Sequence, residues 1–168
     1  AADLINSANK PLIIAGHGVM ISGAEEELVT LAEKASIPVV NTLLGLSTVP
    51  SEHPLFKGMV GMHGNIGANI NTNKCDVLVA IGMRFDDRVT GDTETYAKQA
   101  KIIHVDIDPS EFDKNIKSDV SILGDAKTVL KELQPMVKQA EHKEWLASFD
   151  LPDKVEFEKV VKEEVYPQ

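Results

Sequence analysis

The feature of this sequence that most limits its fold is a series of short apolar segments separated by helical or loop segments. Five of them predict β-strands, at 11–16, 37–41, 76–82, 101–108 and 119–123. The third, DVLVAIG, is apolar throughout its interior, which is typical of a strand covered on both faces. Strands that alternate with helices favour parallel βαβ units. The sequence therefore predicts an α/β fold: a doubly wound, mostly parallel sheet of about six strands with helices on both faces.

Two segments show the periodicity of helices. The segment at 22–36, SGAEEELVTLAEKAS, has Ser22 as a candidate N-cap and acidic residues in its first turn. The segment at 124–139 begins with Asp125, another candidate N-cap, and keeps helical periodicity to Pro135. We expect one domain over 1–140. The charged remainder, 141–168, is interrupted by Pro152 and predicts a partly helical linker that leads out of the domain.

Composition excludes several classes of function. With 168 residues, 43% of them hydrophobic and 26% charged, the chain matches an ordinary globular domain. A net charge of −9 argues against nucleic acid binding, which needs clustered Lys and Arg. No apolar run approaches the ~18 residues of a membrane-spanning helix. The lone Cys75 cannot form an internal disulfide, which favours a reducing, cytoplasmic setting. Because residue 1 is not Met, we expect a fragment of a longer protein.

In a doubly wound sheet, ligands bind beyond the carboxyl ends of the strands. Each predicted strand is followed there by glycine, an acid or an arginine. The segment at 16–21 matches G-x-G-x-x-G except for its last residue, and the only two arginines, Arg84 and Arg88, follow the strand at 76–82. Bare glycine backbone can approach a pyrophosphate, and a planar guanidinium binds phosphate in a way that lysine cannot imitate. The sequence therefore predicts a Rossmann-like, dinucleotide-binding domain.

Each of these motifs also has a purely structural interpretation. The segment at 16–21 could be a tight strand-to-helix turn, and RFDDR could be a surface cluster of ion pairs. In GMVGMHGNIG, glycine occupies every third position from Gly58 to Gly67. This spacing fits an extended ligand lying along the chain, with Asn65 as the cap of a following helix, and it also fits close packing of a helix on the sheet.

A complete active site is absent from the sequence. His104 lies between Ile103 and Val105, so we expect it to be a core histidine, whereas His63 is flanked by glycines and is expected to face a ligand. Metal-ligand spacing is absent from Cys75 and from the histidines at 17, 53, 63, 104 and 142. The sequence predicts a domain that holds a cofactor without a catalytic centre or a metal site.

Four motifs, GMVGMHG, GMRFDDRVTG, HVDIDPSEF and ILGDAKTVL, resemble in order and spacing the central domain of acetolactate synthase. The resemblance covers nearly the whole chain, and RFDDRVTG is specific to that family among thiamine-dependent enzymes. It implies a central domain that binds FAD, between two domains that bind thiamine diphosphate and Mg²⁺. The closing YPQ resembles the start of the third domain. One departure is His17, because many members have a third glycine between Gly16 and Gly18.

The resemblance implies a set of cofactor contacts spread over the loops that follow the strands. These positions are Gly16, Gly18, Thr42, Leu43, Val60, Gly61, Met62, His63, Gly82, Met83, Arg84, Asp86, Arg88, Val89, Asp106, Ile107, Asp125 and Ala126. It also puts Met62, Asp87 and Arg88 near the substrate channel, where the arginine helps to select the second 2-oxo acid.

The reaction that the resemblance implies is decarboxylation of pyruvate followed by ligation to a second pyruvate or to 2-oxobutyrate, in branched-chain amino-acid biosynthesis. FAD undergoes no required redox change in it. The family's activating glutamate and its metal–diphosphate motif are not in these residues, so the fragment alone is expected to be inactive. Implied partners are the other domains of its own subunit, further catalytic subunits in a dimer or tetramer, and a small regulatory subunit. Two alternatives stay open: the central domain of a glyoxylate carboligase or pyruvate oxidase, and a stand-alone nucleotide-binding module.

Overall fold

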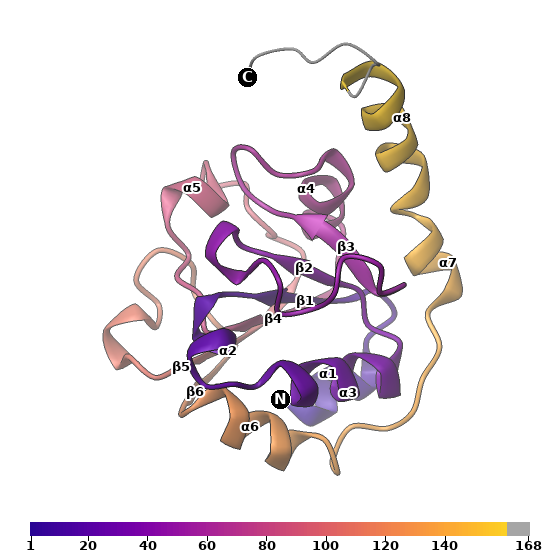
Figure 1. The fold of residues 1–168 in the computed structure, drawn as a ribbon. Helices are drawn as coiled ribbons and strands as arrows, with labels where there is room; N and C mark the ends of the chain where they lie inside the picture. The colour runs from indigo at the N-terminus through magenta and orange to yellow at the C-terminus, as the bar shows by residue number, and fades with distance from the viewer. Residues whose placement is uncertain (161–168) are drawn as a thin grey trace.

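The computed structural model describes residues 1–160 and has a single parallel sheet at its centre (Figure 1). Its six strands lie in the order β3-β2-β1-β4-β5-β6, and every neighbouring pair is parallel. The chain runs outward from β1 to one edge, then crosses to β4 and runs to the other edge. This order is that of doubly wound dinucleotide-binding sheets. The strands are β1 (Pro11–Ala15), β2 (Val39–Asn41), β3 (Phe56–Met59), β4 (Val77–Ile81), β5 (Lys101–Asp106) and β6 (Val120–Leu123).

Helices pack on both faces of this sheet. They are α1 (Ala2–Ser7), α2 (His17–Ile21), α3 (Glu25–Ala35), α4 (Ile66–Thr72), α5 (Asp87–Thr90), α6 (Ala126–Leu133), α7 (Lys143–Ala147) and α8 (Asp150–Val160), with short 3-10 turns η1 (Leu43–Gly45) and η2 (Pro109–Glu111). The predicted fold class is therefore confirmed.

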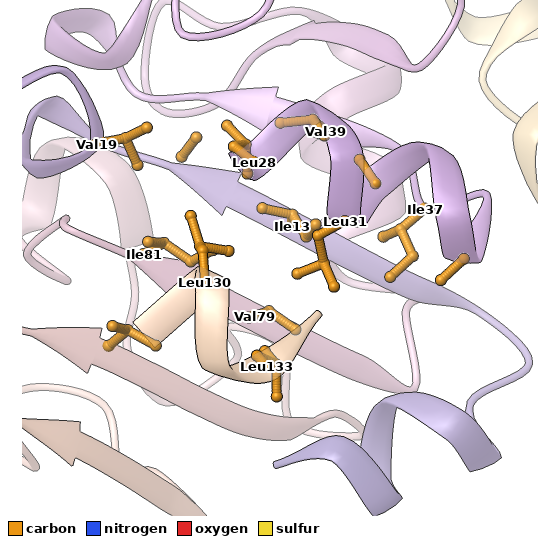
Figure 2. Close-up of a cluster of buried hydrophobic side chains, with 14 of the residues drawn as sticks. Ile13, Val19, Leu28, Leu31, Ile37, Val39, Val79, Ile81, Leu130 and Leu133 are labelled. Atoms are coloured by element: carbon orange, nitrogen blue, oxygen red, sulfur yellow. The ribbon is translucent and has the colours of Figure 1, made fainter. Parts of the chain in front are cut away.

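Strand alternation divides the core into two layers. On one face, Ile13 and Val79 of the central strands pack with Leu31 of α3 and Leu130 of α6 (Figure 2). Leu12 and Leu78 point to the other face, where they pack with α4, α7 and the segment after β4. Every residue of β1 and β4 is buried, as predicted for strands covered on both sides. Full burial of each such Leu or Ile side chain contributes about 1.5–3 kcal/mol, and this fixes the register of the strands.

The N-terminal helical region differs from the prediction. The helix predicted over 22–36 begins at Glu25, because Gly23 adopts φ +60° and separates it from a short helix, α2, that was not predicted. Ser22 is the C-cap of α2 rather than the N-cap of α3, and that N-cap is Ala24. Asp125, in contrast, is the N-cap of α6, where its carboxylate accepts a hydrogen bond from the Thr128 amide.

The edge strand β3 was also missed by the prediction. Its sequence, FKGM, has neither the apolar run nor the alternation of a typical strand, and all of its residues are half-buried. Gly58 within it adopts φ +88°. Its pairing with β2 is irregular. Asn65 is the N-cap residue of α4, as predicted, and its Oδ1 accepts a hydrogen bond from the Met59 amide.

The tail that follows α6 returns to the start of the domain. Trp145 of α7 is buried, and its indole N–H donates to the Pro11 carbonyl at 2.7 Å. Phe149, also fully buried, stacks edge-to-face on Trp145. The first part of the predicted linker is therefore packed against the sheet. Pro152 lies in the first turn of α8, where a helix tolerates proline, and it does not interrupt the helix as predicted. The YPQ motif lies outside the described residues.

Candidate functional site

All of the predicted cofactor positions lie at the carboxyl edge of the sheet. Gly16 and Gly18 follow β1, Thr42 and Leu43 follow β2, Val60 to His63 follow β3, Gly82 to Val89 follow β4, Asp106 and Ile107 end and follow β5, and Asp125 and Ala126 follow β6. Because all six strands are parallel, their loops meet on this one edge. Residues that are far apart in the sequence thus come together here.

The centre of the edge is a close contact between two glycine turns. Gly16 and Gly18 follow β1, and Gly82, with φ +58°, follows β4. Gly18 N–H donates to the Gly82 carbonyl at 2.9 Å. A Cβ on Gly18 would stand 2.7 Å from the Gly82 Cα, and a Cβ on Gly16 would meet the Gly82 carbonyl oxygen. These glycines are therefore required for the contact between the two turns, while His17 between them is exposed.

A pocket of about 220 Å³ opens beside this contact. It lies beside the turns that follow β1 and β4, the neighbouring strands at which the strand order reverses and where doubly wound sheets bind ligands, and it extends over the ends of β5 and β6. Its lining is Gly18, Ile21, Ser22, Gly82, Val105, Asp106, Ile107, Gly124, Asp125 and Ala126. Six of these positions had been predicted as cofactor contacts. The other four are Ile21, Ser22, Val105 and Gly124, which were not predicted as contacts. The only signal for them in the sequence is that each lies next to or near a predicted contact.

Two acidic residues of the predicted site have local structural partners. Asp106 is largely buried, and its Oδ1 accepts a hydrogen bond from the Asp108 amide at 2.9 Å. Asp125 lies at the rim of the pocket while it caps α6. Both carboxylates can still accept further hydrogen bonds, because a carboxylate has about four acceptor positions. The pocket thus combines bare backbone with hydrogen-bond acceptors.

The segment after β4 presents both arginines to solvent. Side chains of Arg84 and Arg88 are 67% and 72% exposed. Arg84 is 3.5 Å from Asp86, and Arg88 is 4.0 Å from Asp87. Exposed pairs of this length contribute only ~0–1 kcal/mol, so they leave the guanidinium groups available to a ligand. The ion pairs that the structural interpretation of RFDDR predicts are therefore present.

The loop after β3 is hydrogen-bonded to the segment that follows β4. The Met62 amide donates to the Arg88 carbonyl at 2.9 Å, and the Arg88 guanidinium lies 3.7 Å from the Met62 sulfur. Asn69 of α4 bonds to both the N–H and the C=O of Gly61, which adopts φ +110°. Met62 and His63 are exposed. The structure thus brings together Met62 and Arg88, two of the residues predicted near a channel, with Asp87 adjacent.

The loop after β2 is held by a buried amide that sequence reasoning missed. Asn41 is fully buried at the end of β2, and its Nδ2 donates to the Gly45 carbonyl at 2.6 Å. The Thr42 amide donates to the Ala15 carbonyl, while Leu43 is 67% exposed. A polar residue at the end of an otherwise apolar strand was the available signal for Asn41.

Groups of three or more His, Cys, Asp or Glu side chains able to hold a metal ion are absent from residues 1–160. No helix in that part of the chain is long and apolar enough to cross a membrane. Burial raises the pKa of the Cys75 thiol to about 12, so this cysteine has no thiolate for nucleophilic chemistry at neutral pH.

Comparison with known proteins agrees with this geometry. A family model described as "Thiamine pyrophosphate enzyme, central domain" matches residues 1–133. The chain is 57% identical over 133 residues to a probable acetolactate synthase large subunit of Methanocaldococcus jannaschii, covering 79% of this chain and 22% of that protein. It is 52% identical over 142 residues to a probable acetolactate synthase large subunit of Methanococcus aeolicus, covering 84% and 23%. The acetolactate synthase large subunit of Corynebacterium glutamicum is 50% identical over 138 residues, covering 82% and 22%.

The chain thus spans less than a quarter of the length of these relatives. The matched region contains the whole six-stranded sheet and ends with α6. The boundary predicted at residue 140 stays a prediction, and the packed helix α7 lies beyond both limits. The family model that matches residues 1–133 and the similarity to the acetolactate synthase large subunits show that this chain, with its six-stranded sheet, belongs to the family of thiamine pyrophosphate enzyme central domains.

Proposed function

We propose that this chain is the central domain of an acetolactate synthase large subunit and that it binds FAD along the carboxyl edge of its sheet. The observation that carries the proposal is the pocket beside the contact between Gly18 and Gly82, which is flanked by Asp106 and Asp125. It occurs in a chain whose relatives are named acetolactate synthases.

The residues present fit a flavin dinucleotide. Glycine turns let backbone approach a pyrophosphate, carboxylates accept hydrogen bonds from ribose or ribityl hydroxyls, and guanidinium groups neutralise phosphate. At about 220 Å³ the pocket is smaller than a typical ligand site, so it holds one part of a dinucleotide. The remainder would extend over exposed apolar side chains on the same edge, such as Leu43, Met62 and Ile107.

In this proposal the domain binds and orients, and the chemistry occurs elsewhere in the full-length enzyme. Thiamine diphosphate with Mg²⁺ supplies the decarboxylation of pyruvate and its ligation to pyruvate or 2-oxobutyrate, on other domains. Arg88, with Met62 and Asp87, lies on the side facing the substrate channel and helps to select the second 2-oxo acid. The isolated chain is expected to be inactive. Its partners would be the other domains of its subunit, further catalytic subunits and a small regulatory subunit, in the cytoplasm.

The test uses the full-length protein that contains this chain. It is incubated with pyruvate, thiamine diphosphate and Mg²⁺, with and without FAD, and acetolactate is measured while the flavin spectrum is recorded. We expect acetolactate only with FAD present and a flavin that stays oxidised. Parallel incubations contain glyoxylate in place of pyruvate, or pyruvate with inorganic phosphate and O2. Carboligation of glyoxylate in the first, or acetyl phosphate in the second, without acetolactate would assign the chain to a different thiamine enzyme. Tight nucleotide binding without any carboligation would favour a separate binding module.

A further inference from the structure

We propose that His104 and Asn115 are positioning residues for the arginine segment, which we define as Met83 to Arg88. Each side chain fixes one main-chain carbonyl of that segment, and together they determine where Arg84 points, while Asp86 is also held as the N-cap of α5. The inference rests on the proposed FAD-binding function, and it assigns the segment's geometry to one buried residue and one accessible residue that bond to its main chain.

His104 is a fully buried polar ring in the middle of β5. Its Nε2 lies 2.9 Å from the Met83 carbonyl oxygen. Because a carbonyl oxygen only accepts hydrogen bonds, Nε2 carries the proton and donates. The ring is packed edge-on against Phe85 at 5.0 Å and Phe112 at 5.2 Å between centroids. A phenylalanine could fill this space, so what the histidine adds is its N–H group, which also lies 3.8 Å from the Asp106 Oδ2.

Asn115 makes the equivalent contact two residues further along the segment. Its Nδ2 donates to the Phe85 carbonyl at 2.8 Å. Phe85 is itself buried between His104 and Tyr96, with which it forms edge-to-face ring contacts. The segment is thus held by two carbonyl anchors and one buried ring, from parts of the chain that follow β4 by more than twenty residues.

These anchors determine which side chains face the ligand edge. Met83 and Phe85 are both 4% exposed, whereas the Arg84 and Asp86 side chains are 67% and 38% exposed. Residues 83 to 86 of the segment therefore alternate like a strand, with apolar side chains inward and ionic side chains outward, although no strand among the described residues pairs with them. The ladder hydrogen bonds that would normally impose this alternation are replaced by the donors of His104 and Asn115. Without these donors, the Met83 and Phe85 carbonyls lose their partners, and Arg84 between them loses its fixed orientation.

His104 has no part in proton transfer in this proposal. It is inaccessible to solvent, and its Nε2 is committed to the Met83 carbonyl. Its Nδ1 is buried without a hydrogen-bond partner among the described residues. Its role is to act through the main chain on groups that would touch the cofactor.

The test measures FAD affinity by flavin fluorescence titration of the full-length enzyme, together with its melting temperature. His104→Phe keeps the ring shape and removes the donor, whereas His104→Gln keeps a donor near the Nε2 position. We expect His104→Phe to raise the Kd for FAD about tenfold, because it misplaces one charge-assisted contact, and His104→Gln to remain within about twofold of wild type. Asn115→Leu, at a more accessible position, should weaken binding similarly and serves if His104→Phe does not fold.

The matched control is Ile103→Ala. Ile103 is the neighbouring residue of β5 but belongs to the core layer on the opposite face of the sheet. It should lower the melting temperature without changing FAD affinity. Unchanged affinity in both His104→Phe and Asn115→Leu would overturn the positioning role, as would an equal loss in Ile103→Ala. A wild-type enzyme that binds no FAD would instead overturn the proposed function.

Discussion

The contact between the Gly18 and Gly82 turns leads to a quantitative prediction for Gly82→Ala. At φ +58° an alanine is strained by about 1–2 kcal/mol. Its Cβ would also lie 2.6 Å from the Gly18 Cα and 3.0 Å from the Val19 nitrogen, all of it main chain that cannot rotate away. Relieving such overpacking costs about 1–3 kcal/mol. We therefore expect Gly82→Ala to lower the free energy of unfolding by about 2–5 kcal/mol.

Gly23 supplies a control with nearly the same backbone angle. It adopts φ +60°, and a Cβ there would meet nothing within 4 Å. Gly23→Ala therefore contains the backbone strain without the steric conflict. Urea unfolding of the chain, followed by far-UV circular dichroism, should show Gly82→Ala less stable than Gly23→Ala by about 1–3 kcal/mol, or roughly 2–12 °C in Tm. Equal losses in the two variants would refute the explanation by close approach.

Three further predictions concern the tail, an ion pair and the cysteine. Trp145→Phe removes the N–H that donates to the Pro11 carbonyl and should cost about 1–3 kcal/mol in thermal unfolding, whereas no loss would show that the tail is not part of the cooperative unit. The hydrogen bond from Lys101 lowers the pKa of Asp119 in the folded protein. Its contribution to the free energy of unfolding is therefore present above pH ~4, and it disappears as the pH falls through the lower folded-state pKa. Asp119→Asn should therefore be about 1 kcal/mol less stable than wild type at pH 7, and the difference should close in acid; a gap that persists at low pH would contradict this sign. Cys75, with its pKa raised to about 12, should react with iodoacetamide at neutral pH only after unfolding, and fast labelling of the native chain would contradict its burial.

The fold could be predicted largely because parallel strands are visible as apolar runs. Strand β4, and strand β5 apart from Lys101, are buried on both faces, so their sequences carry the signal without help from their neighbours. The missed β3 is an edge strand with a glycine at positive φ, and its pairing depends on β2 rather than on its own pattern. The missed α2 is too short to show a period, and the Gly23 turn that ends it lies inside an apparently helical segment.

The sequence could predict that the candidate site lies at the carboxyl edge of the sheet and which loops form it. The glycines and arginines marked these loops because parallel topology puts every strand end on one side. What the sequence could not show was how the loops are held. Asn41, Asn69 and Asn115 each bond to main chain of a loop, and an asparagine that anchors a loop looks in sequence like one that merely faces solvent. His104 was expected to be a satisfied core histidine. Its contact with the Met83 carbonyl confirms this for Nε2, while Nδ1 is unpartnered among the described residues.

Because buried and exposed side chains alternate in the arginine segment, the number of residues in the segment is more strictly constrained than the identity of its exposed side chains. Side chains at the outward positions could change identity, and with it the ligand they favour, without disturbing the buried Met83 and Phe85. Removing or inserting one residue would instead exchange inward and outward positions, burying a guanidinium and exposing a phenyl ring. Natural or engineered diversity in this segment should therefore arise by substitution at constant length, and a library built on it should vary Arg84 while keeping its spacing to Gly82 and keeping Asp86, whose carboxylate caps α5.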